Sequence, residues 1–466
     1  MAWEPKGAQI EAMKRSHGKR GFGYFMEQGL GKTSTTYGDF LDNAVDYDLG
    51  RMVTIAPNSF KGGWADEVDK FGFPIVPIVV ESGNIDHLPK LFRRGFAARP
   101  NLIVNYEAIR HQSTRDLIAE FIRDRRCYIA ADESIQLKNY KSDQTKAALE
   151  LAPQFEFRRI LSGKPIAQGP HDLWAQGRFI GLWNGQVYHA FRNAFCKMGG
   201  FKGKKIVGVQ NEDILAERLD PHVFRATKAE WTDLPPKIYT IRDYKLTPTM
   251  LSMYRSMEED FVLWLEETGE AVTVDQAITK YIKLAQIQAG FIIDENKKTH
   301  ILVEPKQNPR LNALADIIED EIPGKTIVVY NHKVIRPMLM DRFAHLNPTF
   351  IAGGMTTDEI EANKRVFNND PSCRSIFVTK AAKYGHTLLG LPRFEDHCST
   401  EIFLENTYSL DDRSQLEDRA HRYGQMGETM SYYDLVGTKL DRDAVKALQR
   451  KEDVFQAVFR HIGKNR

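Results

Sequence analysis

The chain has 466 residues, enough for two or three domains, and its 42% hydrophobic and 11% aromatic content excludes a wholly disordered protein. Its 64 basic and 62 acidic residues leave a net charge of only +2, so a nucleic-acid surface could only be a local patch. The four cysteines form no CxxC pair, which argues against a zinc finger or a disulfide framework and indicates a reducing compartment.

The first half of the chain alternates short apolar runs with segments long enough for helices. Each run is rich in β-branched or aromatic residues and stops at Gly, Pro, Asn or Asp. Repeated strand–helix units predict a parallel sheet covered by helices on both faces. The predicted strands are Gly23–Met26, Met52–Ala56, Leu102–Tyr106, Cys127–Ala131 and Arg159–Leu161, and the helices between them include Lys32–Asn43 and Ser113–Arg125.

The pattern changes after Pro165, where helical spacing predominates, and Pro235 and Pro236 then indicate a linker. We therefore expect an α/β protein with a first domain at 1–235, helical at about 166–230, and a second at 236–466, with a helical protrusion at about 245–300. The helices predicted here are His171–Phe195, Asn211–Leu219, Thr247–Thr268 and Val274–Ala289, followed by strands at Thr326–Tyr330, Thr349–Ala352, Ser375–Thr379, Glu401–Leu404 and Ser431–Val436.

A glycine-rich segment, Met26–Thr33, follows the first strand and opens a helix. Glycines let backbone N–H groups approach a phosphate chain, a lysine neutralises the β- and γ-phosphates, and a hydroxyl binds Mg²⁺. Lys32 and Thr33 would fill the last two roles. Met26 stands where the strict GxxxxGK[ST] pattern has its first glycine, so the match is partial, and the alternative is an ordinary glycine-rich turn.

Two carboxylates, Asp132 and Glu133, follow an apolar strand, where open α/β sheets place their ligands. One can hold Mg²⁺, and the other can orient and deprotonate the water that attacks a phosphoryl group. Alone, such a pair is more often a solvated loop or a helix cap, but the phosphate loop about 100 residues earlier favours the catalytic interpretation.

A segment near the end of the second half, Ser414–Gln425, looks helical up to Gly424. Spacings of four and three would place Gln415, Arg419 and Arg422 on one face. A guanidinium directed at a γ-phosphate stabilises the transition state of phosphoryl transfer, although a solvated charged face is the alternative. If these arginines and Lys32 contact one nucleotide, that nucleotide must lie between the two domains.

These motifs, in this order, resemble the superfamily 2 helicase core, most closely its SNF2-like branch. Met26–Thr33 is similar to motif I, Asp132–Asn139 to motif II and Leu161–Ile166 to motif III. Val53–Phe71 resembles motif Ia and Pro5–Gln9 the adenine-reading glutamine motif, while Leu234–Lys237 resembles the linker of this family. Motifs IV to VI would be Ile327–Asn331 with Gly353–Gly354, Thr379–Leu389 and Gln415–Gln425.

The resemblance implies two RecA-like domains in tandem with helical insertions, and an ATPase that uses Mg²⁺ to move along double-stranded DNA. It implies a monomer in the cytoplasm of a bacterium or a phage-infected host, with no membrane partner. The residues that it assigns to ATP are Gln9, Gly29, Gly31, Lys32, Thr33 and Ser34, with Asp132, Glu133, Gln415, Arg419 and Arg422 in metal binding and hydrolysis. Those that it assigns to nucleic acid are Asn58, Lys61, Trp64, Asn105, Tyr106, Asn331, His332, Gly353 and Lys380.

The sequence departs from the family pattern in motifs II, III and V. Ser134 and Ile135 stand where the family usually has Ala-His, and Ser162 and Lys164 replace the threonines of Thr-Gly-Thr-Pro. These departures leave more than one interpretation of how hydrolysis is coupled to movement. The alternatives are a strand-separating or branch-migrating helicase on forked DNA and an ATP-gated DNA clamp with little turnover; a small-molecule kinase would leave the second domain unexplained.

Overall fold

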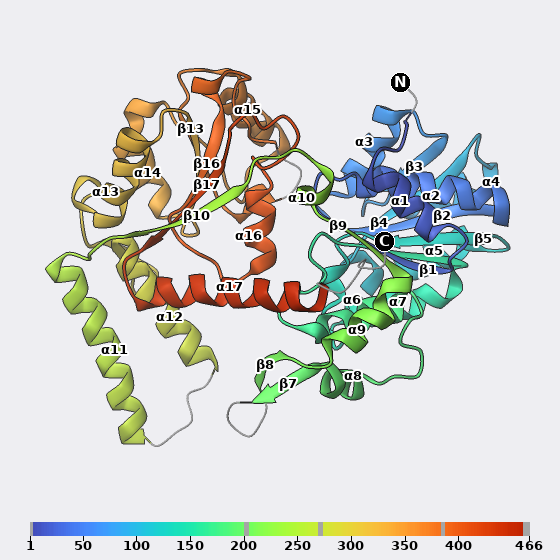
Figure 1. The fold of residues 1–466 in the computed structure, drawn as a ribbon, viewed down its shortest axis with the longest axis horizontal. Coiled ribbons are helices and arrows are strands. Elements are labelled where there is room, and N and C mark those ends of the chain that lie inside the picture. Colours follow the sequence, from blue (N-terminus) through green and yellow to red (C-terminus); the bar gives the residue numbers. More distant parts are fainter. Residues whose placement is uncertain (1–2, 200–204, 269–273, 384–386, 460–466) are drawn as a thin grey trace. The chain divides into compact units, whose positions relative to one another are not determined.

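The computed structural model describes residues 3–199, 205–268, 274–383 and 387–459 (Figure 1). Two compact units divide the chain: one contains Met1–Asp233 together with the segment from Arg450 onward, and the other contains Leu234–Gln449. Helix α17 (Lys439–Phe459) therefore contributes residues to both.

The first unit is built on a seven-stranded sheet in the order β3-β4-β2-β5-β6-β1-β9. Every neighbouring pair is parallel, as the strand–helix alternation predicts. Its strands are β1 (Gly21–Met26), β2 (Leu49–Ala56), β3 (Ile75–Val79), β4 (Arg99–Asn105), β5 (Arg126–Ala131), β6 (Phe157–Leu161) and β9 (Val223–Ala226). All five strands predicted for the first half are present, whereas β3 and β9 were not predicted.

Helices cover both faces of this sheet because alternate side chains along each strand are buried on opposite sides. Along β2, for example, Val53 and Ile55 belong to one core and Met52 and Ala56 to the other. One face carries α1 (Ala8–Ser16), α2 (Lys32–Tyr47) and α3 (Lys61–Phe71). The other carries α4 (Leu88–Arg94), α5 (Gln112–Ile122), α6 (Asp143–Leu151), α7 (Leu173–Phe179), α8 (Tyr188–Phe195) and α9 (Glu212–Leu219).

The long helix predicted over His171–Phe195 is wrong, because the structure has two helices, α7 and α8, with turns between them. Gly181 and Gly185 lie in these turns at φ values of +85° and +82°, a left-handed conformation that interrupts a helix. A short hairpin of β7 (Cys196–Gly199) and β8 (Lys205–Val209) follows, and the one-turn helix α10 (Lys228–Trp231) follows β9.

The second unit has a six-stranded parallel sheet in the order β10-β17-β16-β13-β15-β14. Its strands are β10 (Lys237–Asp243), β13 (Lys325–Val329), β14 (Thr349–Ile351), β15 (Ser375–Val378), β16 (Cys398–Phe403) and β17 (Met430–Val436). The five strands predicted after residue 320 are confirmed. The two parallel sheets with helices on their faces confirm the predicted fold class of two RecA-like domains.

One face of this second sheet packs on α13 (Pro309–Ala315) and α14 (Ile335–Arg342), and the other on α15 (Thr357–Asn369) and α16 (Leu410–Glu417). Two longer helices, α11 (Pro248–Thr268) and α12 (Val274–Ala289), project from this unit (Figure 1). A two-stranded ribbon of β11 (Phe291–Ile293) and β12 (Thr299–Ile301) follows them.

Candidate functional site

The phosphate loop joins the carboxyl end of β1 to the amino end of α2 and depends on two left-handed glycines. Gly29 and Gly31 have φ values of +87° and +79°. A Cβ atom at Gly31 would lie 1.9 Å from Gln9 Nε2, so a larger residue could not occupy this position without displacing Gln9. Gln9 Nε2 also donates to Ser34 Oγ at 3.4 Å. The structure thus brings together Gln9, Gly31 and Ser34, and their role in binding a nucleotide stays a prediction.

Lys32 is the first residue of α2, and its side chain turns back over the loop. Its Nζ donates to the carbonyl oxygen of Met26 at 3.0 Å, and the half-buried Thr33 follows it. The free N–H groups and the dipole at a helix N-terminus attract anions, and Lys32 adds a full positive charge at the same place.

A second lysine, Lys228, lies beside the phosphate loop and was not predicted from the sequence. Its backbone N–H donates to Glu27 Oε2 at 2.8 Å, and its Cε atom lies 3.8 Å from a Cβ atom built on Gly29. Lys228 is only 3% exposed. No local pattern could have identified it, because β9 pairs with β1 only in the folded sheet.

The two carboxylates follow β5, and β5 and β1 both flank β6 in the sheet. Because all three strands are parallel, their carboxyl ends meet at one edge, which brings Asp132 and Glu133 to the edge of the phosphate loop. Burial raises the pKa of Asp132, while a hydrogen bond from Trp64 and the charge of Lys32 oppose this rise. Glu133 has a φ of +46°, a left-handed conformation that is uncommon for a residue with a side chain.

Two buried aromatic residues hold Asp132. Trp64 Nε1 donates to Asp132 Oδ2 at 2.8 Å, and Tyr106 Oη donates to the Asp132 carbonyl oxygen at 2.7 Å. Asp132 Oδ1 accepts the N–H of Glu133 at 2.9 Å. Trp64 is 0% exposed and Tyr106 is 2% exposed. These two rings are inaccessible to nucleic acid in this structure, which corrects the expectation that they contact it, and they position a site carboxylate instead.

The other nucleic-acid candidates of the first unit also differ in accessibility. Lys61 is buried, and its Nζ donates to the Val80 carbonyl oxygen at 3.0 Å and pairs with Glu81 at 2.9 Å. The side chain of Asn105 donates to Glu107 at 2.8 Å, and Asn58 is exposed. Of the five candidates, only Asn58 and Asn105 therefore present accessible side chains.

Motif II is tied to motif III through Gln176 of α7, another residue that the sequence did not single out. Ser134 Oγ donates to Gln176 Oε1 at 2.8 Å, and Gln176 Nε2 donates to the Pro165 carbonyl oxygen at 2.7 Å. Ile135 stands where the family usually has histidine. It is 2% exposed, so the replacement places an apolar side chain in the core.

In the second unit, Asn331, His332, Gly353 and Lys380 all follow the carboxyl ends of the neighbouring strands β13, β14 and β15. His332 Nδ1 lies 2.7 Å from Glu405 Oε1, and Glu405 Oε2 accepts the N–H groups of Asn331 and His332. Burial lowers the pKa of His332, but the hydrogen bond and charge of Glu405 outweigh it and raise that pKa above its usual value. Part of motif V, residues 384–386, lies outside the described residues.

The helix predicted up to Gly424 ends instead at Glu417, so the expected shared face of Gln415, Arg419 and Arg422 is wrong. Beyond Glu417, a backbone group forms a hydrogen bond with a distant part of the chain instead of within a helix: the Arg419 carbonyl oxygen accepts the N–H of Leu388 at 3.1 Å. Gln415 and Arg419 still lie together, because Arg419 Nε donates to the Gln415 carbonyl oxygen at 2.7 Å. Arg422 is half-buried, and burial lowers its pKa.

A buried charge cluster lies beneath α16. Arg413 pairs with Glu417 at 2.7 Å and with Asp434, and Lys237 pairs with Glu417 at 2.8 Å. Glu401, on β16, is fully buried, and neither of its carboxyl oxygens has a hydrogen-bond partner among the described residues. Burial and the charge of Glu417 raise the pKa of Glu401 to about 8, although Arg413, Lys237 and Arg419 oppose this.

Glu401→Gln is therefore expected to remove a pH dependence of stability. Unfolded Glu401 releases its proton above its ordinary pKa of 4.5, whereas the folded protein retains it up to about 8. Between these values the folded state binds more protons, so Glu401 lowers stability as the pH rises, by up to about 1.4 kcal/mol per pH unit. Urea unfolding at pH 5 and pH 8 measures this. The variant should match the wild type at pH 5 and exceed its stability at pH 8.

The exposed Glu395 provides the matched control, because Glu395→Gln makes the same chemical change in solvent. If the stability of the wild type and that of the Glu401→Gln variant depended equally on pH, Glu401 would be ionised in the folded protein.

Among the described residues, no group of three or more His, Cys, Asp or Glu side chains could hold a metal ion by itself. A magnesium ion is usually held by one or two carboxylates together with substrate phosphates, and Asp132 beside the phosphate loop fits that arrangement. Across the described ranges, each helix is too short or too polar to cross a membrane.

The family model described as the SNF2-related domain matches residues 12–290, more than half of the chain. The match agrees with the SNF2-like resemblance inferred from the motifs. Among solved structures, the chain is similar to the Sulfolobus solfataricus SWI2/SNF2 ATPase core in complex with dsDNA, at 21% identity and a TM-score of 0.42, covering 98% of this chain and 99% of that one.

Three curated relatives show comparable similarity. TATA-binding protein-associated factor BTAF1 of Arabidopsis thaliana is 24% identical over 86% of this chain and 22% of its own length. A Caenorhabditis elegans homolog of SWI/SNF-related matrix-associated actin-dependent regulator of chromatin subfamily A-like protein 1 is 23% identical over 93% and 58%. Protein p41 of Acyrthosiphon pisum secondary endosymbiont phage 1 is 26% identical over 62% of each chain. The chain thus spans less than two thirds of each relative.

Proposed function

Because the chain belongs to the SNF2-related domain family, we propose that it hydrolyses ATP and uses the energy to move along double-stranded DNA. The observation that carries the proposal is the meeting of the phosphate loop and the acidic pair at one edge of the first sheet, where the charge of Lys32 acts on Asp132. A cationic loop beside a buried carboxylate is the arrangement that binds a magnesium nucleotide.

In this proposal the N–H groups around Gly29 and Gly31 and the ammonium of Lys32 bind the phosphates. Thr33 and Asp132 would hold Mg²⁺, which neutralises phosphate charge when it is bound. Glu133 orients the attacking water and accepts its proton. Gln9 and Ser34, which adjoin the loop, contact the adenine side of the nucleotide.

The second unit would supply the remaining contacts. Arg419 and Arg422 stabilise charge on the transferred phosphoryl group, and Gln415 supports Arg419. DNA phosphates are bound by accessible amides, imidazoles, backbone groups and lysines at the strand ends, which position the protein without reading sequence. These residues are Asn58, Asn105, Asn331, His332, Gly353 and Lys380. We further propose that the protein acts as a monomer in the cytoplasm of a bacterial or phage-infected cell.

Steady-state ATP hydrolysis tests the proposal when measured without nucleic acid and then with blunt duplex, single-stranded DNA, forked DNA and RNA at one fixed salt concentration. Strong stimulation by blunt duplex is the expected result. Stimulation mainly by forks or single strands would favour the helicase alternative, and ATP binding without turnover would favour the clamp. Lys32→Ala should abolish hydrolysis, and turnover that persists in this variant would contradict the assigned site.

Trp64→Phe is expected to weaken the apparent affinity for Mg²⁺ about tenfold, because Asp132 loses the donor that orients it. The measurement is ATP hydrolysis against Mg²⁺ concentration. Trp174→Phe is the matched control, since Trp174 Nε1 donates to the Gln186 carbonyl oxygen at 2.9 Å and not to a site residue. Equal shifts in the two variants would exclude a positioning role for Trp64.

A further inference from the structure

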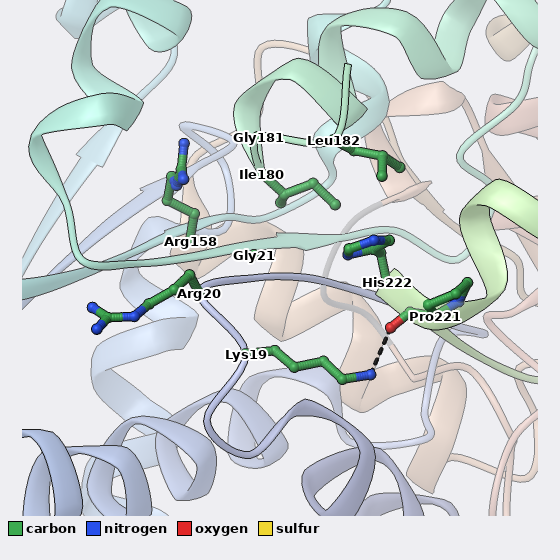
Figure 2. Close-up of a pocket in the computed structure, with 9 residues that line it drawn as sticks. All are labelled: Lys19, Arg20, Gly21, Arg158, Ile180, Gly181, Leu182, Pro221 and His222. Carbon is green, nitrogen blue, oxygen red and sulfur yellow. Dashed lines mark hydrogen bonds between the residues drawn. The ribbon is translucent and has the colours of Figure 1, made fainter. Parts of the chain in front are cut away.

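A pocket of about 520 Å³ opens on the first unit (Figure 2). It lies at the amino end of β1, where Gly21 pairs with Arg158 of β6, whereas the phosphate loop follows the carboxyl end of β1. The pocket is lined by Lys19, Arg20, Gly21, Arg158, Ile180, Gly181, Leu182, Pro221 and His222. Its volume is in the range of small-molecule sites.

The ionisable side chains that line this pocket are all basic, and no acidic residue is among them. Figure 2 shows Arg20 and Arg158 on one side and Lys19 and His222 on the other. The lining therefore carries net positive charge, which Glu156 beside Arg20 and Asp220 near Lys19 offset in part.

These cations differ in the partners that they already have. Arg20 forms an ion pair with Glu156, and Lys19 Nζ donates to the Pro221 carbonyl oxygen at 2.6 Å. Within the described ranges, Arg158 has no ion-pair partner, and its buried Nε has no hydrogen-bond acceptor. A buried guanidinium nitrogen without an acceptor lowers the stability of the folded protein. An anion that accepts this hydrogen bond and pairs with the charge would recover that free energy.

The ionisation of the basic groups in this pocket favours an anionic ligand. Burial lowers the pKa of Lys19, of Arg158 and of His222. Gly181 keeps the space beside Arg158 open, because a Cβ atom there would lie 3.0 Å from a guanidinium nitrogen. An anion bound beside Arg158 would favour the charged forms of all three groups.

We propose that this pocket binds a phosphate monoester that carries an apolar body. The guanidinium of Arg158 matches the oxygens of a phosphate, a group that carries about −1.5 to −2 at pH 7, and Lys19 adds a second positive charge to the lining of the pocket. Ile180, Leu182 and Pro221 form the apolar wall against which the body packs. Free nucleoside monophosphates and the 5′-phosphorylated ends of nucleic-acid strands both present this chemistry, and the inference does not depend on the proposed ATPase.

Calorimetric titration of the full chain with phenyl phosphate tests the proposal. The Lys32→Ala variant serves as the background, so that the phosphate loop does not contribute. Phenyl phosphate should bind with one-to-one stoichiometry, and Arg158→Gln should weaken this binding about 10- to 100-fold. Arg93→Gln, at a side chain that is 78% exposed, is the control and should leave binding unchanged. Unchanged binding in Arg158→Gln, or benzoate binding as tightly as phenyl phosphate, would overturn the proposal.

Circular dichroism checks that Arg158→Gln is folded, and Lys19→Gln gives an independent test if it is not. Competition then distinguishes the sources. Displacement of phenyl phosphate by a 5′-phosphorylated oligonucleotide, but not by its 5′-hydroxyl counterpart, supports a strand end as the ligand. Displacement by adenosine monophosphate but by neither oligonucleotide supports a free nucleotide.

Discussion

Glu133→Gln is expected to reduce ATP turnover by about 10²- to 10⁴-fold while ATP binding persists. Glutamine keeps the size of the side chain and its hydrogen-bonding capacity but cannot accept a proton. The neighbouring Asp132 remains held by Trp64 and Tyr106, so the substitution leaves the proposed metal ligand in place. Only the step that needs a base should therefore be lost.

Single-turnover hydrolysis and equilibrium binding of a fluorescent ATP analogue separate the two effects. Glu150→Gln, at an exposed position on α6, is the matched control and should behave as the wild type. A Glu133→Gln protein with normal turnover would show that another group deprotonates the water. A wild type without turnover would instead favour the ATP-gated clamp.

Asp39→Ala is expected to lower the free energy of unfolding of the first unit by about 3–5 kcal/mol, because it leaves a buried arginine without its counter-charge. Asp39 Oδ2 accepts Arg159 Nε at 2.8 Å and Tyr128 Oη at 2.7 Å. Asp39 Oδ1 accepts Ser16 Oγ at 2.7 Å. Arg159 and Asp39 are 0% and 1% exposed, so water cannot replace the lost carboxylate.

Urea unfolding followed by circular dichroism measures this loss. Asp46→Ala is the control on the same helix, since Asp46 is exposed and pairs with the exposed His17, so its loss should cost less than about 1 kcal/mol. A loss of similar size in both variants would mean that the buried pair contributes little. The network matters for the site because it joins α1, α2, β5 and β6, and Lys32 begins α2 while the acidic pair follows β5.

The central strands, and the functional residues that follow their carboxyl ends, could be predicted from the sequence. Buried parallel strands are continuous apolar runs, and the glycine-rich segment and the acidic pair each directly follow one of them, so both features are local. The edge strands β3, β9 and β10 were missed because their patterns are weak: β3 contains Pro77, and β10 is largely exposed. The end of α16 was missed because contacts from elsewhere in the chain replace its last helical turns.

Other features were decided only by the tertiary structure. Trp64 reaches Asp132 across 68 residues of sequence, and Lys228 reaches Glu27 across 201. The proposed anion pocket likewise combines residues from four separate segments around Gly21, Arg158, Gly181 and His222. The sequence by itself determined where strands, helices and chemical groups occur, because backbone periodicity is a property of neighbouring residues. Which side chains are buried, paired or left without a counter-charge depends on contacts that exist only after the sheet has assembled, and such contacts leave no periodic pattern along the chain.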